Sequence, residues 1–214
     1  MKRTAFLILI VVAVTIGAFA AGKVEKVGPF AGEASEALKS ALQSEGYRVY
    51  LPNTLVGCEV WFAAKTAEGK NTGQGTSYPD FKESTFLGVI TFPKGGGTDF
   101  RGQSVRAGSY TMRYEVLPSD GNHLGVAPYP DFVLLTPIAD DPDPNATFDF
   151  VQLMEKSRAA SRTSHPASFE MLPPEKGEPA VTQTDDGWVV LHGTVTTADG
   201  KKLPVALVVK GSAT

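Results

Sequence analysis

The chain has 214 residues, with 20 Lys and Arg against 23 Asp and Glu, and a formal net charge of −3. This mildly acidic balance, without a cluster of basic residues, argues against a protein that grips nucleic acid or anionic lipid, since both need concentrated positive charge. The single cysteine, Cys58, excludes an intramolecular disulfide, and its place on one strand face with Val60 and Phe62 predicts a buried thiol.

The first twenty residues have the layout of a secretory signal peptide. Two basic residues precede an apolar run over residues 4–19, and Ala18 and Ala20 suit a cleavage site. The run is somewhat shorter than the roughly 20 apolar residues that a membrane-spanning helix needs. We therefore predict a leader over residues 1–20 and a single domain over residues 21–214. The protein is expected to be secreted or periplasmic, with membrane contact only through the leader if it is not cleaved.

Two short helices are predicted. The first covers residues 36–42, with Ser35 as its N-cap and Gly46 just beyond its C-terminus, where a residue at positive φ is common. The second lies around residues 150–158, with Asp149 near its N-terminus.

Strands make up most of the remaining pattern. They are predicted over residues 47–51, 58–64, 86–92, 110–116 and 131–135, with a hairpin of residues 188–196 and 203–209 across an Asp-Gly turn. The 110–116 run alternates most clearly, which predicts a half-buried strand with Arg113 and Glu115 on its polar face. The expected fold is mostly β, an antiparallel β-sandwich (jelly-roll or Ig-like) with one N-terminal helix and one short later helix.

One stretch of the chain carries a family resemblance. Residues 107–110 read Ala-Gly-Ser-Tyr at the start of the alternating strand, and the pattern continues through residues 120–125 and 129–132. This AGxY turn-and-strand resembles an uncharacterised family of bacterial exported β-sandwich proteins. The resemblance implies the fold and the compartment, and it implies no activity.

A divalent metal site is one hypothesis. Zinc or iron would take two histidines and a carboxylate from separate loops, and the candidates are His123 and His165 with Asp131 or Asp141. The alternative is that these are loop residues that hydrogen-bond the backbone. The acidic run over residues 140–145 also suggests calcium, but its spacing departs from that of an EF-hand loop.

A binding surface is a second hypothesis. Trp61 and Trp188 alternate away from their apolar neighbours, so on exposed strand faces they would stack on sugar rings or anchor a partner. Arg113 would hold an anionic group with its guanidinium fork. The alternatives are that both indoles belong to the core and that Arg113 pairs with Glu115 or another acid.

Three function classes follow from these patterns. The first is an exported, non-catalytic binding or accessory module for a small molecule, a glycan or a protein. The second is a metal-dependent enzyme or metal-binding protein that uses His123, His165 and loop aspartates. The third is a structural or assembly protein, aided by a polar, Gly-rich loop over residues 65–77. No nucleophile elbow of the G-x-S-x-G type is present in the sequence.

Overall fold

The fold is mostly β, with antiparallel sheets and two α-helices, as the sequence predicts. In the computed structural model, the described residues are 22–52, 56–67, 69–71, 73, 75–118, 127–161 and 163–211. The predicted leader and His123 lie outside these ranges.

The larger sheet has seven antiparallel strands, and their spatial order follows the sequence apart from one excursion between β4 and β7. In order, the strands are β1 (Lys23–Val27), β2 (Gly46–Tyr50), β3 (Val56–Phe62), β4 (Phe86–Phe92), β7 (Gly108–Val116), β8 (Asp131–Pro137) and β9 (Ser168–Glu170). The excursion is a two-stranded hairpin of β5 (Gly97–Thr98) and β6 (Ser104–Val105). A short 3₁₀ helix, η1 (Ile138–Asp140), follows β8.

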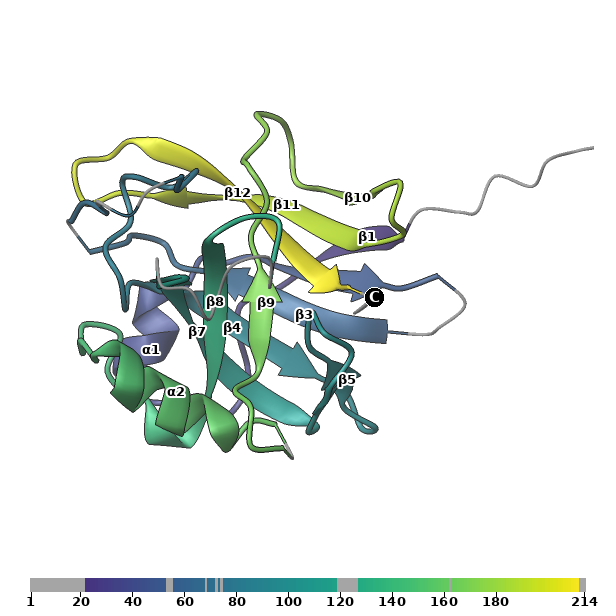
Figure 1. Cartoon of the computed structure of the whole chain (residues 1–214), viewed down its shortest axis with the longest axis horizontal. Coiled ribbons are helices and arrows are strands. Elements are labelled where there is room, and N and C mark those ends of the chain that lie inside the picture. Colours follow the sequence, from purple (N-terminus) through teal and green to yellow (C-terminus); the bar gives the residue numbers. More distant parts are fainter. Residues whose placement is uncertain are drawn as a thin grey trace, which may run out of the picture.

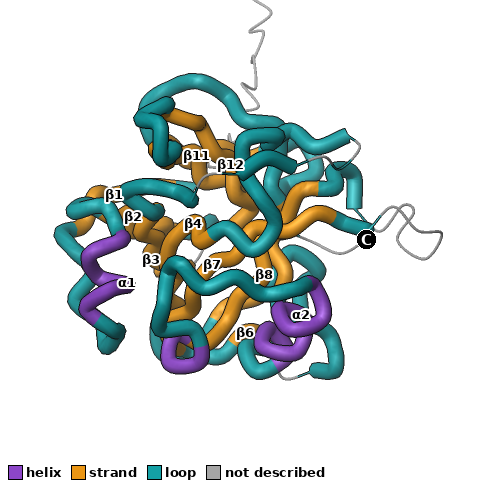
Figure 2. The backbone as a smooth tube through the Cα atoms, turned by 90° about the vertical axis from the view of Figure 1, so that its left-hand side faces the viewer, coloured by secondary structure: helices purple, strands orange, loops and turns teal. Residues whose placement is uncertain are grey.

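A second sheet lies on one face of the first (Figure 1). It contains three antiparallel strands, β10 (Ala180–Gln183), β11 (Val189–Thr196) and β12 (Lys202–Lys210). The predicted C-terminal hairpin is confirmed, because β11 pairs with β12 along its whole length. In Figure 2, β11 and β12 lie above the larger sheet and the two helices lie below it.

The main hydrophobic core is one cluster to which both sheets contribute. Its buried residues include Val60, Met112 and Val133 on the larger sheet and Leu191 and Leu207 on the smaller one. Cys58 belongs to this core, as predicted, and burial raises the pKa of its thiol to about 12. Such a thiol stays protonated and unreactive at neutral pH.

Helix α1 (Glu36–Ala41) covers one end of the opposite face of the larger sheet. Ser35 caps it, as predicted, by accepting a hydrogen bond from the Leu38 backbone N–H. The prediction for Gly46 is wrong, because this residue begins β2. A Cβ atom there would lie 2.4 Å from the Trp61 indole nitrogen, so the position needs glycine for its contact with the indole.

Helix α2 (Phe150–Arg158) covers the other end of that face, against β8. The predicted boundary is confirmed, and Asp149 and Gln152 form a reciprocal capping box at the N-terminus. None of the helices in the described part of the chain is long and apolar enough to cross a membrane.

Strand β7 differs from its prediction. The alternation predicts one polar, solvent-facing side, but every residue from Tyr110 to Val116 is buried. After β8, η1 and the loop that follows it return over the polar face of β7, where Asp141 accepts a hydrogen bond from Thr111 and the Ala146 carbonyl accepts one from Arg113. Arg113 and Glu115 are therefore buried ionisable residues.

Candidate functional site

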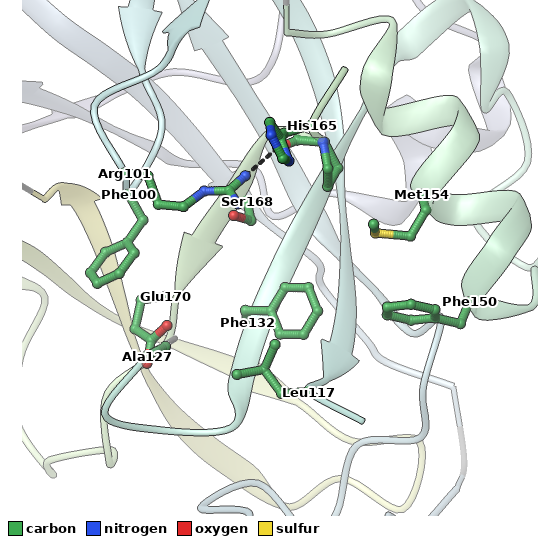
Figure 3. A pocket seen from close by; sticks show the side chains of 11 residues that line it. Phe100, Arg101, Leu117, Ala127, Phe132, Phe150, Met154, His165, Ser168 and Glu170 are labelled. Carbon is green, nitrogen blue, oxygen red and sulfur yellow. Dashed lines mark hydrogen bonds between the residues drawn. The ribbon is translucent and has the colours of Figure 1, made fainter. Parts of the chain in front are cut away.

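A pocket lies where β8 and β9 meet α2 and the β5–β6 hairpin (Figure 3). Its volume is about 170 Å³, and it opens to solvent. The lining is mostly apolar and comes from segments far apart in the sequence: Phe100, Arg101, Leu117, Ala127, Phe132, Phe150, Met154, His165, Pro166, Ser168 and Glu170. Ligand sites commonly combine such an apolar lining with a few convergent polar groups.

The apolar wall is formed by β8 and α2. Phe132 projects from β8, and Phe150 and Met154 lie one helical turn apart on the face of α2 that packs on this strand. In Figure 3, these three side chains lie on one side of the pocket, with Leu117 beside Phe132. Their spacing explains the wall, since residues four apart on a helix share one face.

The opposite wall is the tip of the β5–β6 hairpin, which carries Phe100 and Arg101. Buried Asp99 holds this tip by accepting hydrogen bonds from the backbone N–H groups of Arg101 (3.0 Å) and Gln103 (2.8 Å). Burial raises the pKa of the Asp99 carboxyl, and these hydrogen bonds and the Arg101 charge oppose the rise. The hairpin therefore presents Phe100 and Arg101 in a fixed geometry.

Arg101 already has partners at this wall. Its Nη2 lies 3.7 Å from Asp99 Oδ2 and donates to the Pro166 carbonyl at 3.0 Å, a contact drawn as the dashed line in Figure 3. Most of its charge is therefore balanced within the protein. The exposed His165 ring lies next to it at the same end of the pocket.

Glu170 lies at the other end, in the last position of β9. It is directly opposite Phe132 in the sheet register, so both side chains face α2 rather than the main core. Only 3 % of Glu170 is exposed, and its Oε1 accepts a hydrogen bond from the Tyr129 N–H at 3.1 Å. Burial is the main cause that raises the pKa of its carboxyl to about 8, and the charge of Asp131 acts in the same direction.

A second buried carboxyl, Glu115, occupies the same row of the sheet on the far side of Phe132. Burial, followed by the nearby Glu83 charge, raises the pKa of its carboxyl to about 8. Its Oε1 has no hydrogen-bond partner among the described residues. Glu115 therefore lies on the same sheet face as Glu170, but it does not line the pocket.

Arg113 is fully buried, so the expectation that it lies on a solvent-facing side is wrong, and the alternative that it pairs with an acid is confirmed. It forms a two-pronged pair with Asp141, with Nε 2.8 Å from Oδ2 and Nη2 2.7 Å from Oδ1. Its remaining N–H groups donate to the backbone carbonyls of Ser84, Asp143, Pro144 and Ala146. Arg113 therefore holds the loop after β8 onto the sheet, and its donors are occupied by the protein itself.

The two aspartates of the metal hypothesis lie in separate networks. Asp131 accepts hydrogen bonds from Thr76 (2.6 Å), the Ser77 backbone (2.7 Å) and Tyr114 (2.5 Å), whereas Asp141 binds Arg113 and Thr111. His165 lines the pocket. Within the described ranges, no group of three or more His, Cys, Asp or Glu residues could hold a metal ion. The predicted set also includes His123, which lies outside those ranges.

The two tryptophans do not form an exposed stacking surface. Trp61 is buried beneath α1, where its indole N–H donates to the Gly28 carbonyl at 2.9 Å and its ring meets Phe30 edge-on. Trp188 is half-buried and packs edge-on against Phe100 at 5.0 Å between ring centroids. Trp188 therefore supports the hairpin wall of the pocket from behind.

Two wider depressions elsewhere on the described surface, of about 290 and 400 Å³, are lined largely by polar side chains. The first is spanned by ion pairs of Asp80 with Lys70 and Lys201. Neither presents an aromatic wall, which makes the smaller pocket at α2 the stronger candidate for a ligand site.

No protein-family model, curated protein or solved structure matches this chain. The resemblance to exported β-sandwich proteins therefore stays a prediction, and the function has to be argued from the pocket itself.

Proposed function

We propose that the protein is a non-catalytic binding module and that its ligand is a small molecule with one apolar ring, held in the pocket between α2 and the β5–β6 hairpin. The observation that carries this proposal is the aromatic lining of that pocket, which Phe100, Phe132 and Phe150 supply from three separate segments of the chain. An apolar cavity of about 150 Å³ in another protein accommodates benzene. The present pocket, of about 170 Å³, has the size for a single ring and opens to solvent to admit a head group.

Solution NMR with benzyl alcohol as the probe tests this proposal. Adding the probe is expected to shift resonances of residues around Phe132, Phe150 and Met154 and to leave those around α1 unchanged. The variant Ser168→Trp places an indole in the pocket and should abolish the shifts. Ser164→Trp is the matched control, because Ser164 is exposed outside the lining. Shifts that persist in Ser168→Trp, or that centre elsewhere, would overturn the proposal.

We propose further that the two main sheets form a β-sandwich. The shared core supports this architecture, as does a cross-sheet contact in which a Cβ atom on Gly193 of β11 would lie 2.2 Å from the Phe62 ring of β3. Gly193→Ala should therefore cost about 1 to 3 kcal/mol of folding free energy through overpacking. Gly177→Ala, in open space, is the control. Equal stability of the two variants would contradict the sandwich.

Export of the protein is also proposed here, on the strength of the sequence of residues 1–20. Mass spectrometry of the protein recovered from the periplasm or medium of a bacterial host should give a mature chain that starts near Ala21. Recovery of the whole chain from the cytosol alone would argue against export.

A further inference from the structure

We infer that the pocket selects ligands that carry an ammonium group beside the ring, with the Glu170 carboxylate as the group that receives it. This inference rests on the proposed function and adds the chemical class of the ligand.

Glu170 has unused acceptor capacity. A carboxylate has about four lone-pair positions for hydrogen bonds. In the described part of the chain, the one hydrogen bond it receives comes from the Tyr129 backbone, and it forms no ion pair there. A buried carboxylate without a cation is costly, so a cation that reached it from the pocket would gain a strong, desolvated partner.

The local charge also favours a cation. Asp131, the other charge that acts on Glu170, is negative and raises the pKa of the Glu170 carboxyl together with burial. An ammonium group at this end of the pocket would therefore pair with Glu170, and the negative charge of Asp131 on the other face of the sheet would add to the attraction at longer range. A carboxylate ligand placed there would be repelled by the same two charges.

The walls next to Glu170 suit the rest of such a ligand. Phe132 is its direct cross-strand neighbour, and Phe100 faces it from the hairpin in Figure 3. Aromatic faces attract ammonium groups as well as apolar rings. An aromatic amine would therefore match both the head-group position and the surrounding lining.

The positive end of the pocket is the competing site. Arg101 and His165 lie near Ser168, two residues and about 6.6 Å along β9 from Glu170. However, Arg101 is already balanced by Asp99 and bound to the Pro166 carbonyl, whereas Glu170 has no such counter-ion within the described residues. The ionisable group in the pocket that lacks a partner of opposite charge among the described residues is therefore the acid, and for this reason we favour an amine over an acid as the ligand.

Isothermal titration calorimetry of the full chain at pH 8 with three probes of equal ring size tests the inference. Benzylamine is expected to bind at least tenfold more tightly than benzyl alcohol, and benzoate more weakly than either. Glu170→Gln should reduce the preference for benzylamine to less than threefold and leave the affinity for benzyl alcohol within threefold. Glu175→Gln, which removes an exposed acid outside the pocket, should keep the full preference.

Each other outcome has one meaning. Equal affinities for the three probes, or tightest binding of benzoate, would overturn the amine inference and leave the proposed binding function standing. A preference that survives Glu170→Gln would overturn it as well. Failure of all three probes to bind the wild-type chain would overturn the proposed function itself. The wild-type ranking needs no variant, so the inference is tested even if Glu170→Gln fails to fold.

Discussion

The two helices cover two halves of the same sheet face, and they do so in opposite ways. Under α1, the contact is an apolar cluster in which Leu38 and Phe30 pack with Trp61 of β3 and with Phe86 and Val89 of β4. In the half that α2 and the loop after β8 cover, the apolar contact is interrupted by the buried ionisable residues Arg113 and Glu115 on β7 and by Glu170 beside a cavity on β9. The sheet is continuous, so the difference comes from the residues on each strand.

Two kinds of buried ionisable group can therefore be distinguished: those that hold the fold together and those that are available to a ligand. Arg113 has every arm of its guanidinium in a hydrogen bond with the protein. Glu170 has one hydrogen bond within the described residues and faces a cavity. A polar group that the protein has already satisfied stabilises the fold, whereas an unsatisfied one beside a pocket is a candidate for recognition.

The largest effect is expected from Arg113→Met. Removing the guanidinium leaves Asp141 buried without its cation, and breaking a buried pair in this way typically costs about 3 to 5 kcal/mol. Urea unfolding monitored by circular dichroism measures the loss. Lys39→Met, which breaks the solvent-exposed pair with Glu36, should change stability by less than about 1 kcal/mol. Comparable losses in the two variants would show that Arg113 does not anchor the α2 half.

A cavity in the α1 half should cost stability without affecting binding. Leu38 is fully buried, so Leu38→Ala is expected to lose about 2 to 5 kcal/mol in the same unfolding experiment. The affinity for benzylamine, measured under conditions where the variant is folded, should stay within threefold of wild type. A large drop in affinity would mean that the two halves are coupled, contrary to the comparison.

The stability of the α2 half should depend on pH through its two buried acids. The folded-state pKa values of Glu115 and Glu170, about 8, lie above the ordinary value of 4.5. The stabilisation from each group is therefore fully present below about pH 4.5 and is lost as the pH rises through 8.

Glu170→Gln removes one of these titrations. The free energy of unfolding of this variant minus that of the wild type should increase by at least ~1 kcal/mol from pH 5 to pH 8.5. This follows because one pKa unit corresponds to about 1.4 kcal/mol. Thermal unfolding at the two pH values measures the difference. Glu175→Gln should have the stability of the wild type at both pH values. If the stability of all three proteins changes equally between the two pH values, Glu170 does not titrate in the folded state.

The smallest effect concerns the caps of the two helices. Asp149→Ala and Ser35→Ala each remove a side-chain acceptor at a helix N-terminus and should each cost about 1 kcal/mol. Only Asp149→Ala is expected to weaken benzylamine binding, because α2 carries Phe150 and Met154 into the pocket. Equal effects of the two variants on affinity would contradict this assignment.

Periodicity was sufficient to predict most elements of the fold. The strands around Cys58, Tyr110 and Phe132 and the caps at Ser35 and Asp149 all depend on local signals, and the structure confirms them. The burial of β7 was not predictable in the same way. Its polar face is covered by η1 and the loop that follows it. The alternation of residues 110–116 gives no sign that a later segment of the chain packs on this strand.

The pocket was missed for a related reason. Its lining residues come from distant segments, and Phe100, Phe132 and Glu170 carry no motif that joins them in the sequence. The alternation of Ser168, Phe169 and Glu170 was the one local signal, since it indicates a strand with an acid on one face. Arg113 and the tryptophans are binding candidates by residue type and by strand alternation. These report the chemistry of a side chain and the strand face that carries it, but not whether the fold has already used it.

The most direct test of the account is a crystal structure of the chain soaked with 4-bromobenzylamine, with the bromine located by its anomalous signal. The account predicts one ordered molecule with its ring between Phe132 and Phe100, its nitrogen within hydrogen-bond distance of the Glu170 carboxylate, and its bromine toward the pocket mouth. An amine bound at Arg101 and His165, or a bromine peak outside the α2 half, would contradict it.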